Sequence, residues 1–105
     1  PPNIKHSWYK FHCYLNKDSL KSDWNREKII DAIINKGYPA FFGSCSEIYL
    51  EKRFAKFGLA PGNRLPIAKE LGETSLMFLV HPTINEEIMN DYANSIKSVL
   101  EMASK

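Results

Sequence analysis

The strongest constraint on the fold is a short apolar segment followed by a long amphipathic one. Residues 75–80 read Ser-Leu-Met-Phe-Leu-Val, without the alternation of a half-exposed strand, which predicts a central strand covered on both faces. Thr83-Ile-Asn-Glu86 then matches a capping box that opens a helix of about five turns. Apolar residues recur along it at helical spacing, at Ile88, Tyr92, Ile96, Val99, Leu100 and Ala103. A strand that is followed by such a helix restricts the chain to folds in which helices pack on a sheet.

The first 43 residues predict a strand, a helix and a second strand. From Trp8 to Leu15, apolar and polar side chains alternate with the period of two that a half-buried strand has. Isoleucines then recur at helical spacing up to Ile34, with Asp23 or Asn25 as the N-cap and Gly37 as the C-cap. Ala40 to Gly43 forms a short apolar strand.

Two shorter helices precede the central strand. Tyr49 to Phe57 has helical character and ends at Gly58, and Pro66 suits the first position of a helix that runs to Gly72. The elements therefore follow the order βαβ, α, α, βα. This order predicts an α/β fold, a small two-layer sandwich with a short sheet and helices packed on it. With 105 residues and 44% hydrophobic content, residues 1–105 fit a single domain.

Composition excludes several classes of function. A net charge of +2, spread as mixed signs, gives no reason to expect nucleic acid as a partner. Cys13 and Cys45 lack the spacing of metal ligands, so we expect no metal site, reduced thiols and a cytoplasmic location. No window reaches the roughly 18 apolar residues of a membrane span, and we expect no membrane partner.

Four segments together resemble one enzyme family. The most specific string is Lys-Glu-Leu-Gly-Glu-Thr-Ser at 69–75, joined with His81-Pro-Thr83. The other segments are residues 6–12, 26–39 and 43–54. Together they resemble the C-terminal small domain of the DegT/DnrJ/EryC1/StrS aminotransferases, which have the fold of type I pyridoxal phosphate (PLP) enzymes. The chain, which starts at Pro1 without a methionine, then reads as the small domain of a longer protein whose large PLP-binding domain is absent.

The resemblance implies a function for that full-length parent. Such a protein uses PLP to transfer an amino group, with glutamate as donor, to a nucleotide-linked keto sugar for polysaccharide or lipopolysaccharide biosynthesis. It works as a homodimer. Family relatives also include dehydratases and regulators, and the lysine that separates dehydratases from aminotransferases lies outside this sequence.

The resemblance also suggests which residues face the substrate. In many members a loop that reads His-Tyr-Pro-x-Pro-Leu-His reaches toward the sugar nucleotide. Here the corresponding loop has no histidine, and Gly43 and Ser44 occupy the His-Tyr positions. The substrate-binding candidates are Ser44, Cys45, Ser46 and Glu47 in this loop and Tyr9 and Lys10 on the first strand.

Each candidate also has a purely structural interpretation. Ser44 or Ser46 suits the cap of the helix that follows. Cys45 suits a small buried side chain, and Tyr9 suits a tyrosine in the core. A surface ion pair is the expected role of Arg64, and a structural hydrogen bond is the expected role of His81.

No catalytic residue is assigned to this chain. PLP chemistry needs a lysine that forms a Schiff base, a carboxylate opposite the pyridine nitrogen and a phosphate anchor. No lysine here has the Ser-x-x-Lys context of the family, so we expect the isolated chain to be inactive and to bind no PLP covalently. A second hypothesis from another class is a free-standing, non-catalytic α/β module that binds a ligand or a partner.

Overall fold

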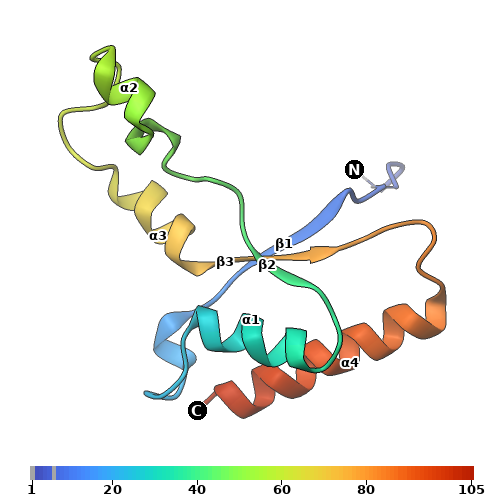
Figure 1. Cartoon of the computed structure of the whole chain (residues 1–105). Helices are drawn as coiled ribbons and strands as arrows, with labels where there is room; N and C mark the ends of the chain where they lie inside the picture. The colour runs from blue at the N-terminus through green and yellow to red at the C-terminus, as the bar shows by residue number, and fades with distance from the viewer. Residues whose placement is uncertain (1, 6) are drawn as a thin grey trace.

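The sheet is built around β3 (Ser75–Leu79), which pairs antiparallel with both other strands. The computed structural model describes residues 2–5 and 7–105, so His6 of the first family segment lies outside the described residues. The strand order is β1 (Lys10–Tyr14), β3, β2 (Ala40–Phe42) (Figure 1). The α/β architecture and the central position of β3 are confirmed.

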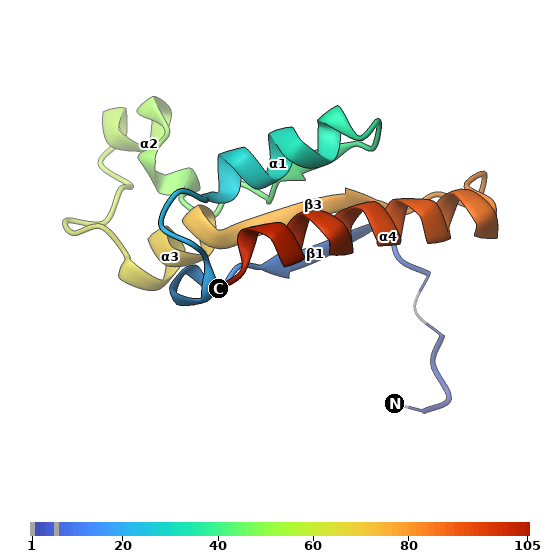
Figure 2. The same ribbon diagram turned by 90° about the horizontal axis from the view of Figure 1, so that it is seen from below.

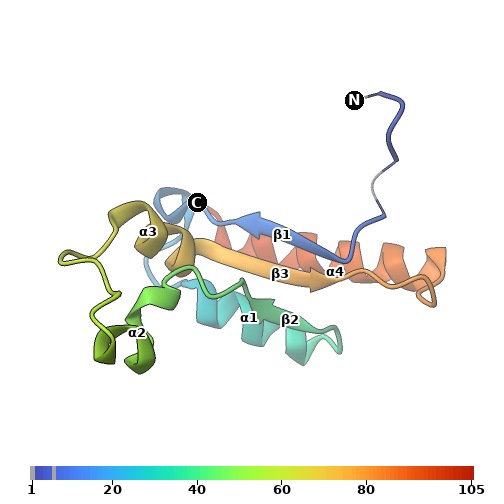
Figure 3. The same cartoon turned by 90° about the horizontal axis from the view of Figure 1, so that it is seen from above.

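Helices cover one face of the sheet, not both. Figure 3 shows α1 (Arg26–Asn35) and α4 (Glu86–Ala103) on the same side of the strands. On that side, Leu76 and Phe78 are buried, whereas Met77, which alternates to the opposite face, is half-buried. Among the described residues, helices cover β3 on one face only, so the prediction that it is covered on both faces is wrong. The core consists of Ile29, Ile30, Ile33, Ala40, Leu76, Phe78, Tyr92, Val99 and Ala103.

Local capping sets the limits of α1. The side chain of Asn25 accepts a hydrogen bond from the Lys28 amide at 2.8 Å, which confirms one of the two predicted N-caps. The helix ends at Asn35 with Lys36 as the C-cap. Gly37 follows one position later with φ of 91°, a conformation that glycine adopts without a steric penalty.

The capping prediction for α4 is wrong by two residues. Asn85, not Thr83, is the N-cap, and its side chain accepts from the Ile88 amide at 2.8 Å. Thr83 instead contacts His81, whose Nδ1 lies 2.7 Å from the threonine hydroxyl. Ile88, predicted to be in the buried stripe of this helix, is 49% exposed, and the buried stripe consists of Tyr92, Val99 and Ala103.

Tyr92 joins three elements in the core. Its ring stacks on Tyr38 with centroids 5.1 Å apart and meets Phe78 of β3 edge-on at 6.1 Å. Its hydroxyl donates to the carbonyl of Pro39, just before β2. Burial raises the pKa of this phenol, so it stays a hydrogen-bond donor at neutral pH.

The segment between β2 and β3 projects from the sheet as an arm. It contains the 3₁₀ turn η2 (Ile48–Leu50), α2 (Lys52–Lys56) and α3 (Pro66–Thr74), which runs directly into β3 (Figure 1). The radius of gyration is 16.7 Å, whereas a compact domain of this length has about 13 Å. Beside the base of the arm, η1 (Lys17–Ser19) is tied to the C-terminus through the Leu20–Ser104 bridge, close to where β1 and α4 end (Figure 2).

We predict opposite outcomes for two neighbouring isoleucines of α1. Ile33 is fully buried, so Ile33→Ala leaves a cavity and lowers the free energy of unfolding by about 2–5 kcal/mol. Ile34 is 48% exposed, so Ile34→Ala changes it by about 0.5 kcal/mol or less. Urea unfolding of both variants measures the difference. Equal losses would contradict this placement of α1.

Candidate functional site

The predicted substrate loop, residues 43–47, is fitted closely against α3 and β3. The Gly43 amide donates to the Ser75 carbonyl at 3.3 Å, which extends the β2–β3 pairing by one residue. A Cβ at Gly43 would lie under 3.0 Å from both the Cβ and the hydroxyl of Ser75. A Cβ at Gly72 would similarly meet the hydroxyl of Ser46. Gly43 is therefore needed for the close approach to Ser75, whereas at Gly72 only the rotatable Ser46 hydroxyl would have to move.

Glu47 ends the loop in a network of hydrogen bonds with Arg64 and Tyr49. Arg64 Nε and Nη2 donate to the two carboxylate oxygens at 2.7 and 2.5 Å, a bidentate pair. The Tyr49 hydroxyl donates to the same carboxylate at 2.7 Å and accepts from the Leu65 amide at 3.0 Å. The side chain of Glu47 is only 13% exposed. Both of its oxygens are thus engaged, and the network fixes the loop to the start of α3.

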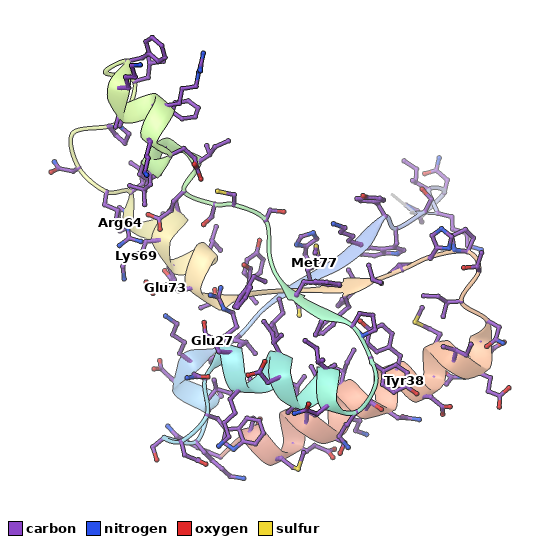
Figure 4. All side chains as sticks on the ribbon, viewed as in Figure 1. Glu27, Tyr38, Arg64, Lys69, Glu73 and Met77 are labelled. Atoms are coloured by element: carbon purple, nitrogen blue, oxygen red, sulfur yellow. The ribbon has the colours of Figure 1, made fainter. Side chains whose placement is uncertain are left out.

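The carboxylates along this side of the arm are held ionised. The Arg64 guanidinium, with a smaller contribution from Tyr49, lowers the pKa of Glu47 to about 2. On α3, Lys69 and then Lys17 lower the pKa of Glu73 to about 2, with Lys69 at 2.8 Å and Lys17 at 2.9 Å. Figure 4 shows Arg64 just before α3, and Lys69 and Glu73 following on the helix.

Arg26 connects the base of the arm to α1. Its Nη1 donates to the Gly72 carbonyl and its Nη2 pairs with Glu27 at 3.2 Å. The guanidinium also lies over the Phe42 ring, 4.5 Å from the centroid. These contacts join α1 to the C-terminal part of α3 and to β2.

The structural interpretations of the loop residues are not supported. The N-cap of η2 is Glu47 and makes no side-chain cap bond, so neither Ser44 nor Ser46 caps that turn. Cys45 is exposed rather than buried. Ser44 is also exposed and Ser46 is half-buried, which leaves polar groups of the loop at the surface. Arg64 forms the expected ion pair with Glu47, and His81 forms the expected structural hydrogen bond.

The other two candidates lie elsewhere on the sheet. Tyr9 is 83% exposed, which excludes the core role, and the Lys10 ammonium lies 5.2 Å from the centre of its ring. Lys10 pairs with Leu79, at the opposite end of β3 from Ser75, a separation of about 13 Å along the strand. β1 is also the opposite edge of the sheet from β2. Tyr9 and Lys10 therefore do not share a site with residues 44–47.

Comparison with solved structures shows which proteins have a similar fold. Over 94% of its length the chain is similar to an aminotransferase from Psychrobacter cryohalolentis, with 48% identity and a TM-score of 0.87. The chain matches the C-terminal part of an aminotransferase. It spans only 25% of that protein's length.

A second solved structure that is similar to the chain has the family in its description. A DegT DnrJ EryC1 StrS aminotransferase from Brucella abortus is similar in fold over 71% of the chain, with a TM-score of 0.58 and 21% identity, and the match spans 20% of that protein. No protein-family model and no curated protein matches the chain. Together, the two structural matches confirm the resemblance predicted from the sequence.

Three of the described lysines are engaged by carboxylates. Lys17 and Lys69 are paired with Glu73, and Lys28 is paired with Asp23 at 3.0 Å, all at the surface. In the described part of the chain, no group of three or more His, Cys, Asp or Glu side chains is arranged to hold a metal ion. Across the same residues, the helices are too short or too polar to cross a membrane.

We predict that Gly43 tolerates no side chain. Gly43→Ala forces Ser75 and the β2–β3 pairing apart and lowers the free energy of unfolding by about 1–3 kcal/mol. Gly62→Ala is the matched control, because a Cβ there meets nothing within 4 Å. Combining Gly43→Ala with Ser75→Gly restores part of the loss. Thermal melts of the three variants test this, and a silent Gly43→Ala would contradict the close packing of the loop.

We predict that Arg64 sets the ionisation of Glu47. Because the folded pKa is lowered, the pair stabilises the fold fully above the ordinary value of 4.5 and loses its effect as pH falls toward about 2. Arg64→Gln returns the pKa of Glu47 toward 4.5. Lys69→Gln is the control, since it raises the pKa of Glu73 and leaves Glu47 low. Carbon NMR of the glutamate carboxyl groups during an acid titration measures both values.

Proposed function

We propose that this chain is the small C-terminal domain of a PLP-dependent aminotransferase that transfers an amino group from glutamate to a nucleotide-linked keto sugar. The observation that carries the proposal is the 48% identity over 94% of the chain to the C-terminal part of an aminotransferase. PLP, held by the large domain, supplies the amino-group transfer chemistry. This chain contributes one wall of the substrate cleft.

The arm is the part of the chain that meets the rest of the enzyme. Between residues 48 and 71, seven large hydrophobic side chains are at least 39% exposed: Ile48, Leu50, Phe57, Leu59, Leu65, Ile67 and Leu71. A collection of apolar side chains of this kind marks an interaction surface. In the proposed parent the arm packs against the large domain or the second subunit of a homodimer, and this contact brings the loop to the cleft.

The loop offers the groups that sugars bind. Ser44 and Ser46 carry hydroxyls that both donate and accept hydrogen bonds, and Cys45 adds a thiol beside them. Glu47 acts differently, because its oxygens are engaged by Arg64 and Tyr49. We assign Glu47 a positioning role. It holds residues 44–46 in place beside the substrate and does not contact the sugar itself.

Tyr9 and Lys10 form a separate contact in this proposal. They lie at the other end and the other edge of the sheet. The Lys10 ammonium suits a phosphate of the nucleotide, and the exposed Tyr9 ring suits stacking. With both cysteines free, we assign the enzyme to the cytoplasm, where sugar precursors of polysaccharide or lipopolysaccharide are made.

Kinetics of the full-length gene product test the proposal. With a nucleotide-linked keto sugar, Ser44→Ala and Ser46→Ala raise KM about 2–10-fold each, the effect of losing one hydrogen bond. The half-reaction with glutamate, followed by the absorbance of the cofactor, stays unchanged. Ser98→Ala on α4, far from the loop, is the control with unchanged KM.

Two outcomes would contradict the proposal in different ways. A lower melting temperature with an unchanged KM would mean that the serines serve only the fold. A gene product that transfers no amino group to any nucleotide-linked keto sugar would refute the assigned reaction and favour the alternative, a non-catalytic binding module.

A further inference from the structure

Helix α4 carries two apolar stripes, and the described residues bury one of them fully and cover the other only in part, since Met89, Ile96 and Leu100 pack against the edge of the core. Tyr92, Val99 and Ala103 are buried against α1 and the sheet. A second stripe, formed by Met89, Ala93, Ile96 and Leu100, follows the spacing i, i+4, i+7, i+11 of one helix face. None of these four side chains is fully buried, and Ala93 is exposed. A helix with apolar side chains on two sides is suited to contact two neighbours.

The second stripe forms one wall of a groove of about 1020 Å³. Trp8 and Phe11, whose rings lie 5.5 Å apart, form the opposite wall near β1. The floor is the C-terminal end of β3 with Val80 after it. Charged groups occur only near one end, at Lys97, Glu101 and Lys105. From Met89 to Leu100 the stripe is about 16 Å long, or three turns of helix.

We infer that a helix of the parent protein, from the segment that precedes Pro1, lies in this groove along α4. The inference rests on the proposed function, because it requires the longer aminotransferase. The chain matches the C-terminal part of such a protein and only 25% of its length. In the proposed parent the large domain precedes Pro1, and Trp8, near that end of the described residues, lines the groove.

The shape and chemistry of the groove favour a helix over other occupants. Helices pack with their axes 8–10 Å apart, and the small side chain of Ala93 in the middle of the stripe permits a close approach. A small polar ligand is disfavoured because such sites orient their ligand with a few polar groups inside the pocket, and here the polar side chains lie at one end. An added strand would pair with the free edge of β1, whereas this groove runs over the face of the sheet beside α4.

Covalent connection favours the preceding segment over a second copy of the chain. A segment that is joined through a short connection to Trp8 has an effective concentration in the millimolar range at the groove. A second copy gains no such advantage. The occupant then covers the second stripe of α4 and attaches the small domain to the large one.

Thiol labelling of the full-length gene product tests whether the groove is covered. In Ala93→Cys the new thiol lies under the inferred helix, and we expect it to react at least 10-fold more slowly than the thiol of Asn94→Cys, which is one position round on the exposed face. Labelling is measured peptide by peptide, so the native Cys13 and Cys45 do not interfere. Equal rates at the two positions would overturn the inference.

Photo-crosslinking identifies the occupant. A benzophenone side chain at position 93 should join a peptide from the region before Pro1 of the same chain, and one at position 94 should not. Crosslinks between two chains would show that a second copy occupies the groove. The absence of any crosslink would show that the groove is open. Either result would overturn the inference. Amino-transfer activity is measured separately on the unmodified protein, so a correct helix in an enzyme with another reaction would refute only the proposed function.

Discussion

The pairing of β3 on both of its edges is the constraint on which the rest of the structure depends. Its five residues set the register of β1 and β2, and its buried Leu76 and Phe78 form the floor on which α1 and α4 pack. α3 runs into its first residue without a connecting loop. The direction of the arm therefore follows from the direction of the strand, and a shift of one residue in β3 would turn the core face outward and move the substrate loop with it.

Three short contacts fix the candidate loop to β3 and to the segment that leads into it. Gly43 lies against Ser75 at the start of β3, Gly72 lies against Ser46, and Arg64 holds Glu47. None of the three involves a large buried surface, since the arm projects away from the core (Figure 1). Steric fit and a bidentate ion pair replace hydrophobic packing here, and this suits a segment whose polar side chains must stay at the surface.

Features that depend on neighbouring residues in the sequence could be predicted, and features that depend on distant pairing could not. The isoleucine period of α1, the choice of Asp23 or Asn25 as its N-cap and the presence of a strand at β3 are local signals, and the structure confirms the helix, the cap at Asn25 and the strand. The cap of α4 failed because Thr83 and Asn85 both suit an N-cap, and His81 competes for Thr83. The Glu47–Tyr49–Arg64 network joins residues that lie up to 17 positions apart, on either side of η2 and α2. No periodicity marks such a contact, so only the folded arm reveals that Glu47 is engaged.

The apolar side chains of this domain are divided between a small buried core and two exposed regions. Nine residues form the buried core, while large apolar side chains collect in two other places, along the arm and in the groove beside α4. Single exposed hydrophobic side chains are ordinary in any protein, whereas large exposed apolar patches mark interaction surfaces. The arm joins β3 at Ser75, whereas the groove extends along α4 from the end of β3 to Lys105. On the proposed function, the rest of the aminotransferase contacts the domain at both surfaces, so β3, which pairs with the loop at Gly43 and lines the groove at Phe78 and Leu79, connects the two interfaces.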